Sequence, residues 1–216
     1  RDTRAEDALD TTIAALSARS RAPFYSAERK SVPLKELIAR LDGRVYSFPA
    51  NIGGLFPFIL QSVHNNFTTG LQQIAFSREA GGALALELVE GEYKHRFTLK
   101  EDCYTSARLS QRGDVFEARF SVQTEISQTG ELSLHIAAHF IETPFTRIIH
   151  MTLSGEDALK VVFDEAPSIR DASEMLMELT GITRVEIVRN MLPLLKQERM
   201  QHTLRTFTTV TVQGKL

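Results

Sequence analysis

Three histidines in the second half of the chain form the residue set best suited to metal chemistry. His135 and His139 are four residues apart in a stretch whose alternation predicts a strand, so both side chains point to the same face. His150 lies in the next predicted strand, and counting back from the Thr143-Pro144 turn places it near His135. Three imidazoles on one face could bind zinc. The alternative is that these histidines are surface residues, because the apolar residues between them would face the core.

Motifs for covalent catalysis are absent from the sequence. A serine nucleophile needs a base beside it, and no Ser-x-x-Lys occurs. The nearest stretch, Ser26 to Arg29, ends in an arginine, which stays charged and cannot act as a base. No Gly-x-Ser-x-Gly, His-Glu-x-x-His, cysteine pair or P-loop is present. The single cysteine, Cys103, follows two acidic residues, which do not favour a reactive thiolate. We therefore expect no catalytic residue and no cofactor in this chain.

The composition is that of a soluble globular protein with one substantial core. Among 216 residues, 43% are hydrophobic and 24% are charged, with a net charge of −2. That balance gives no field that attracts nucleic acid, and the basic residues at 19–30 read as a solvated linker. The longest apolar run, 55–60, is interrupted by Pro57 and is far below the ~20 residues of a membrane helix. We expect no nucleic-acid partner and no membrane span in a bacterial-type protein of the cytoplasm or periplasm, with the compartment left open.

Alternation of apolar and polar residues dominates the middle of the chain. In 83–90, for example, Leu84, Leu86 and Leu88 occupy every second position, as in a half-buried strand. The other predicted strands of this region are 44–48, 71–77, 93–99, 105–109, 115–125, 131–142, 145–154 and 158–164. Short connections between them predict an antiparallel meander that closes into a barrel or packs as a sandwich. Residues 51–66 interrupt the pattern, either as a helical lid over the barrel mouth or as a strand with an irregular start.

The two ends of the chain have helical periodicity. Predicted helices span 6–18, 34–41, 168–179 and 184–201, followed by a final strand at 203–212. This pattern divides the chain into a helical N-terminal segment and linker at 1–41, a β-barrel at 42–166 and a helical C-terminal extension with a strand at 167–216. The fold class is mainly β: an antiparallel barrel of about eight strands with N- and C-terminal helices.

Six large apolar side chains are predicted to point into the barrel. A barrel of this size can hold a small apolar ligand, and it can equally be filled by its own core. Both alternatives remain open for these residues, which are Phe76, Leu86, Phe97, Phe120, Phe140 and Met151.

Residues 37–46, Leu-Ile-Ala-Arg-Leu-Asp-Gly-Arg-Val-Tyr, resemble the entry to the C-terminal domain of serine hydrolases in the β-lactamase and penicillin-binding-protein superfamily. Tyr46 and Asn51 match a tyrosine and an asparagine of that phrase, and residues 143–145 and 148–159 resemble the closing strands of the domain. The resemblance covers about 37–168 and implies a lipocalin-like β-barrel that follows a catalytic domain. The Ser-x-x-Lys and Tyr-x-Asn motifs of that catalytic domain are absent here, so the resemblance carries over no catalytic residue.

Three hypotheses for the function follow. The first is a non-catalytic accessory or interaction domain, which contacts a catalytic domain or a partner subunit through its terminal helices or forms a homo-oligomer. In particular, helix 184–201 is predicted to pack on a partner subunit. The second is a lipocalin-like carrier of a small hydrophobic ligand. The third is a hydrolase whose residues form no recognised motif.

Overall fold

The structure is a computed structural model, and it describes residues 30–64, 67–127, 130–155, 157–167 and 210–216. The predicted helices 6–18, 168–179 and 184–201 lie outside these residues. None of the described helices is long and apolar enough to cross a membrane.

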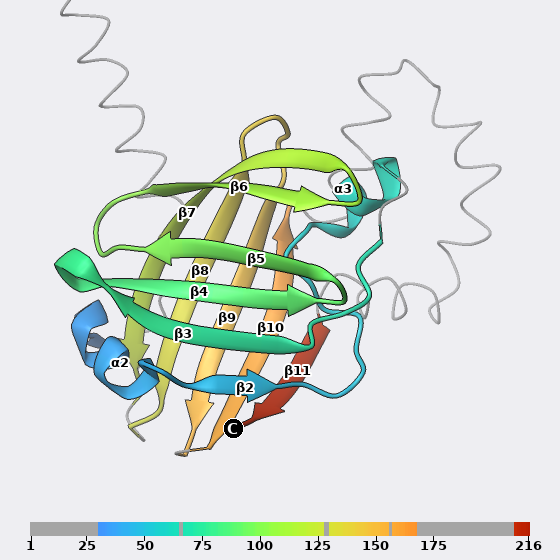
Figure 1. Cartoon of the computed structure of the whole chain (residues 1–216). Helices are drawn as coiled ribbons and strands as arrows, with labels where there is room; N and C mark the ends of the chain where they lie inside the picture. Colours follow the sequence, from blue (N-terminus) through green and yellow to red (C-terminus); the bar gives the residue numbers. More distant parts are fainter. Residues whose placement is uncertain (1–29, 65–66, 128–129, 156, 168–209) are drawn as a thin grey trace, which may run out of the picture.

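Eleven strands of the described residues form one antiparallel sheet (Figure 1). Ten of them follow the order β1-β7-β8-β9-β10-β11-β2-β3-β4-β5, and β6 pairs with β7 beside this path. The strands are β1 (Lys30–Ser31), β2 (Val45–Ser47), β3 (Gln73–Glu79), β4 (Ala83–Glu90), β5 (Tyr93–Leu99), β6 (Thr105–Gln111), β7 (Asp114–Ile126), β8 (Leu132–Phe140), β9 (Thr146–Ser154), β10 (Ala158–Ala166) and β11 (Val210–Lys215). The predicted mainly antiparallel β fold is confirmed, with more strands than the expected eight.

The C-terminal strand β11 lies in the middle of the sheet. It pairs with β10 from Phe163↔Val210 to Ala158↔Lys215, and Lys215 also pairs with Ser47 of β2. The sequence pattern placed a strand at 203–212 in a C-terminal extension. In the structure, the last residues of the chain instead link the β7–β10 half of the sheet to the β2–β5 half.

The sheet curls strongly into a half-barrel, and the long strand β7 has two neighbours along one edge. Its outer edge pairs with β6 over Asp114–Phe120 and with β1 at Glu125 and Ile126. Strands β3–β5 cross in front of β7–β10 in Figure 1, so the two halves face each other. Strands β5 and β6 also lie side by side, and the Thr105 hydroxyl donates a hydrogen bond to the Thr98 carbonyl.

The core fills the space between the two halves of the sheet. Leu84, Leu86 and Leu88 are fully buried, as their alternation predicts. Helix α2 (Leu34–Leu41) adds a buried face of Leu34, Leu37, Ile38 and Leu41. Pro33 is the N-cap of this helix and directly precedes its first residue. Residues 51–57 form an irregular segment followed by the short helix α3 (Phe58–Val63), which agrees with the helical alternative for 51–66.

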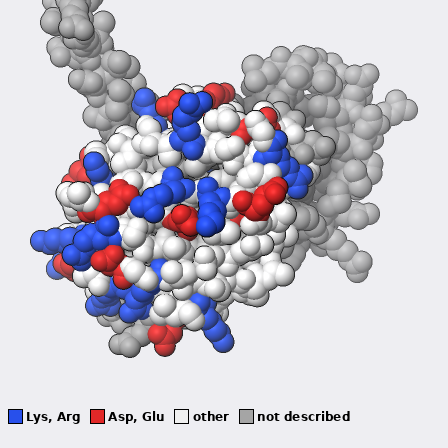
Figure 2. Space-filling view, viewed as in Figure 1, with Lys and Arg blue, Asp and Glu red and all other residues white. Residues whose placement is uncertain are grey.

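The outer face of β3–β5 is solvated and charged. Lys94 lies 3.8 Å from Glu87, and Arg96 lies 2.9 Å from Glu79. Figure 2 shows charges of both signs scattered over this side of the molecule. A 3-10 turn, η2 (Ala80–Gly82), joins β3 to β4, with Gly81 at the positive φ of 74° that this turn requires.

Candidate functional site

The six side chains predicted to line the barrel all belong to the core. Each is at most 2% exposed. Phe97 of β5 and Phe120 of β7 stack with ring centroids 4.0 Å apart and an interplanar angle of 7°, which joins the two halves of the sheet directly. The same cluster includes Phe76, Leu86, Phe140 and Met151. These side chains therefore pack against neighbouring core residues.

The structure brings two of the three predicted histidines together. His135 and His150 are cross-strand partners, and their Nδ1 atoms are 2.5 Å apart, so one ring donates to the other. Glu125, which the sequence did not suggest, places Oε2 3.3 Å from His135 Nε2. His139 instead lies 2.9 Å from the Thr146 hydroxyl, with its ring 5.9 Å from that of Tyr104. In the part of the chain that the structure describes, no group of three or more His, Cys, Asp or Glu residues could hold a metal ion.

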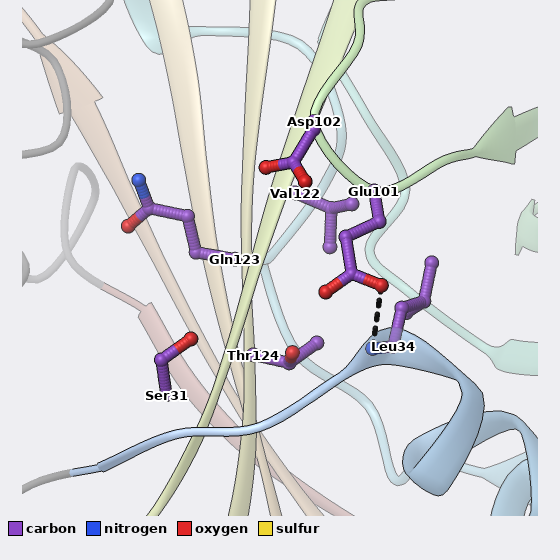
Figure 3. A pocket seen from close by; sticks show the side chains of 7 residues that line it. All are labelled: Ser31, Leu34, Glu101, Asp102, Val122, Gln123 and Thr124. Atoms are coloured by element: carbon purple, nitrogen blue, oxygen red, sulfur yellow. Dashed lines mark hydrogen bonds between the residues drawn. The ribbon is translucent and has the colours of Figure 1, made fainter.

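A shallow pocket of about 70 Å³ lies where β1 and the start of α2 meet β7 (Figure 3). Glu101 Oε2 accepts a hydrogen bond from the Leu34 amide at 3.3 Å, which places a carboxylate at the N-terminus of α2, where negative charge is favourable. The Thr124 hydroxyl donates to the Val32 carbonyl. These polar groups therefore fasten β1 and α2 to the sheet. The side chains drawn in Figure 3 are those of Ser31, Leu34, Glu101, Asp102, Val122, Gln123 and Thr124.

A cluster of three buried charged residues lies inside the curled sheet, apart from the pocket: Glu90 of β4, Arg147 of β9 and Glu165 of β10. We call these three residues the loop clamp. Their exposed fractions are 2%, 1% and 6%. Arg147 Nε donates to the Gly54 carbonyl at 2.8 Å, and its Nη1 lies 3.3 Å from Glu165 Oε2.

Both carboxyl groups of the loop clamp accept hydrogen bonds from the segment that follows Asn51. Glu90 Oε1 accepts from the Leu55 amide at 2.7 Å, and its Oε2 accepts from the Thr68 hydroxyl at 2.5 Å. Glu165 Oε2 accepts from the Phe58 amide at 2.7 Å. Three charged side chains from three strands thus hold the backbone of this segment at residues 54, 55 and 58.

Burial is the largest cause of the pKa shifts in the loop clamp. Desolvation raises the pKa of Glu90, although hydrogen bonds from Thr68 and Leu55 and the charge of Arg147 oppose the shift. Desolvation also raises the pKa of Glu165, against the Phe58 amide and Arg147. It lowers the pKa of Arg147, against the attraction of the two carboxylates. One buried guanidinium therefore faces two carboxyl groups whose pKa values burial raises.

His95 of β5 is a further buried polar residue near the loop clamp. Its ring is 1% exposed, and burial lowers its pKa to about 4, so it is neutral near pH 7. The Phe56 ring, from the clamped segment, lies edge-on to it with centroids 5.3 Å apart. Both nitrogens of the His95 ring lack a hydrogen-bond partner among the described residues.

None of these four buried polar residues was predicted from the sequence, although the strand alternation contains a signal for them. Polar residues in a half-buried strand ordinarily point outward. Each of the four instead stands two positions from an inward-facing apolar residue of its own strand, namely Leu88, Phe97, Ile149 or Phe163. Extending each inward series by one step identifies Glu90, His95, Arg147 and Glu165.

No protein-family model matches this chain, and no curated protein matches it. The chain is a mainly antiparallel β half-barrel domain, and no family is identified for it.

Proposed function

We propose that this chain is a non-catalytic accessory β domain that acts by binding, of the kind found at the C-terminus of serine hydrolases. The loop clamp supports this proposal, because Glu90, Arg147 and Glu165 all form hydrogen bonds with the backbone of the chain itself. A carboxylate that already accepts a buried amide hydrogen bond is a poor general base, since taking up a proton would weaken that bond.

The two residues that carry the resemblance have architectural roles. Tyr46 is fully buried and lies edge-on to Phe76, with centroids 6.1 Å apart. The Asn51 amide nitrogen donates to the carbonyls of Pro49 and Leu71, at 2.7 and 2.8 Å. Its Oδ1 accepts from the amides of Gly53 and Leu71, at 2.9 and 3.1 Å. Asn51 thus joins the chain after β2 to the chain before β3, as expected of a residue in the entry phrase of a domain.

An exposed apolar patch is the observation that carries the binding role. Tyr104, Val115 and Ile141 are 41%, 52% and 48% exposed. Ile141 donates its amide to the Glu117 carbonyl at 2.9 Å, so it continues the β7–β8 pairing and stands diagonally across from Val115. Tyr104 lies farther along the same face: its neighbour Thr105 pairs with Phe120 near the middle of β7, and its ring contacts that of His139. We call these three residues the Tyr104 patch. Exposed apolar side chains on one face of a sheet suit an interaction surface.

A second copy of this chain is the partner that suits the Tyr104 patch. Charged side chains of both signs lie among its members, with Glu117 and Arg119 exposed on β7 and Glu142 exposed after β8. A face that mixes apolar side chains with charges of both signs can be self-complementary, because a two-fold axis can place Arg119 of each copy against a carboxylate of the other. The accessory domain would then act in oligomerisation.

Light scattering on the full chain tests this function. We expect a dimer at micromolar concentration, and we expect Val115→Glu to give a folded monomer, because two buried carboxylates would face each other across the axis. Val45→Glu is the matched control, since Val45 is also an exposed strand valine (39%) but lies on β2. The proposal fails if the wild-type chain is monomeric, or if Val115→Glu and Val45→Glu affect the mass equally.

A further inference from the structure

The buried imidazole of His95 is the feature that neither the fold nor the proposed function uses. The side chain is 1% exposed, and its Nδ1 and Nε2 are both buried without a hydrogen-bond partner among the described residues. Leaving a buried polar group unpaired costs about 1–3 kcal/mol, and native proteins rarely do so. A neutral imidazole offers one donor and one acceptor, so this position can satisfy a hydroxyl group in either direction.

Three aromatic rings surround the position next to His95 that Phe56 fills. The Phe56 centroid is 5.3 Å from that of His95, 5.4 Å from that of Phe116 and 5.4 Å from that of Phe140. The interplanar angles are 74°, 61° and 43°, which suits the edge-to-face attraction of aromatic rings. His95, Phe116 and Phe140 come from strands β5, β7 and β8, and we call these three residues the aromatic box. The box is built from paired strands of the sheet, whereas its occupant comes from an irregular segment.

The loop clamp holds the backbone on both sides of Phe56 but does not hold its side chain. Glu90 binds the Leu55 amide, and Glu165 binds the Phe58 amide. A narrow gap borders the Phe56 ring, lined also by Leu60, Gln61, His64, Gln111 and Phe116. This gap has no room for a water molecule, so displacing the Phe56 ring from His95 requires the side chains around the gap to move.

We propose that the aromatic box is a binding site for a small, neutral aromatic molecule that carries a hydroxyl group. The ring of the ligand takes the place of Phe56 between Phe116 and Phe140, and its hydroxyl group forms the hydrogen bond that His95 lacks. A charged ligand is disfavoured because the surroundings are apolar. This site does not depend on the proposed dimer, since none of its residues belongs to the Tyr104 patch.

Phenol and toluene are suitable probes, because they share a ring and differ in the hydroxyl group. We expect phenol to bind the full chain in calorimetric or NMR titrations and to shift the ring resonances of His95. Phe56→Ala removes the competing ring and should raise the phenol affinity at least about tenfold, as apolar cavities bind small aromatic molecules. Adding His95→Phe should lower the phenol affinity about tenfold, the value of one hydrogen bond, and leave toluene binding unchanged or stronger.

The control is Phe67→Ala, which removes an exposed phenylalanine (43%) near the same segment and should leave phenol binding unchanged. Circular dichroism verifies the fold of each variant, and Phe56→Leu replaces Phe56→Ala if the alanine variant does not fold. The proposal is overturned if the Phe56 variant binds phenol no better than the wild type, or if His95→Phe weakens toluene and phenol binding equally.

Discussion

Arg147 of β9 donates a hydrogen bond from its Nε to the carbonyl of Gly54, 93 residues earlier in the chain and 2.8 Å away. The guanidinium is 1% exposed, and its carbon lies 5.2 Å from the centroid of the Phe163 ring. A fully buried charge is thus used to hold an irregular segment against the core. The stability of this fold therefore depends on the loop clamp as well as on apolar packing.

Replacing Arg147 by methionine should destabilise the fold strongly. The change keeps much of the apolar stem but leaves Glu165 and the Gly54 carbonyl without the guanidinium. Removing one partner of a buried ion pair costs roughly 3–5 kcal/mol, to be measured by urea denaturation. Arg78→Met is the control, because Arg78 is 56% exposed in its pair with Asp42 and should change stability by less than about 1 kcal/mol. Equal stabilities of the two variants would rule out the loop clamp as a major contribution.

Gly54→Ala tests the close approach of the clamped segment to Glu90. A Cβ atom at Gly54 would lie 2.7 Å from Glu90 Oε2 and 3.0 Å from the Thr68 hydroxyl, so the carboxyl that accepts the Leu55 and Thr68 hydrogen bonds would have to shift. We expect a loss of about 1–3 kcal/mol in the free energy of unfolding. In a Glu90→Ala background the same change should cost less, with a coupling of about 1 kcal/mol in a double-mutant cycle. Additive effects would show that the two positions do not interact.

His95 should make the protein sensitive to acid. Its pKa is about 4 in the folded chain against 6.5 for an ordinary histidine, so the unfolded state binds the proton more readily. Stability is therefore lost as the pH falls from about 6.5 to about 4, by roughly 3 kcal/mol. His95→Phe removes this part of the pH dependence, which is read from denaturation curves at several pH values. Parallel pH profiles of wild type and His95→Phe would contradict the buried neutral imidazole.

Glu90 should act in the opposite direction. Burial raises its pKa above the ordinary 4.5, so the folded state binds the proton more readily than the unfolded state. The stabilisation from this carboxyl is complete below about pH 4.5 and declines as the pH rises toward its raised pKa. The stability of Glu90→Gln relative to wild type should therefore increase with pH. Glu87→Gln, on the outward face of the same strand beside Lys94, provides the comparison, and an equal trend in both variants would count against the assignment.

Local alternation was sufficient to predict most of the sheet from the sequence. The bounds of β4 and β5 are those expected, because each strand has a regular apolar series and a short glycine turn at one end. The position of β11 could not be predicted in this way. Its neighbours, β10 and β2, are distant in the sequence, and their pairing depends on long-range register. The two-residue β1 likewise exists only because it pairs with the end of β7.

The buried polar residues show a different limit of sequence reasoning. The sequence offers no reason to expect Arg147 and Glu165 to be buried, because isolated charges rarely are. They are buried because Gly54 and Phe58, more than 90 residues away, supply backbone partners. His135 and His150 were correctly expected to be neighbours, since a short hairpin fixes their register, but Glu125 was not added to them because it lies on another strand.

Cross-linking through Cys103 is the most direct test of the proposed binding role. This free cysteine is exposed and directly precedes Tyr104 of the Tyr104 patch. A short bis-maleimide should join two copies of the wild-type chain, whereas Cys103→Ser or Val115→Glu should abolish the product and Val45→Glu should not. Failure of the wild-type chain to cross-link, or an undiminished product with Val115→Glu, would contradict association through this surface.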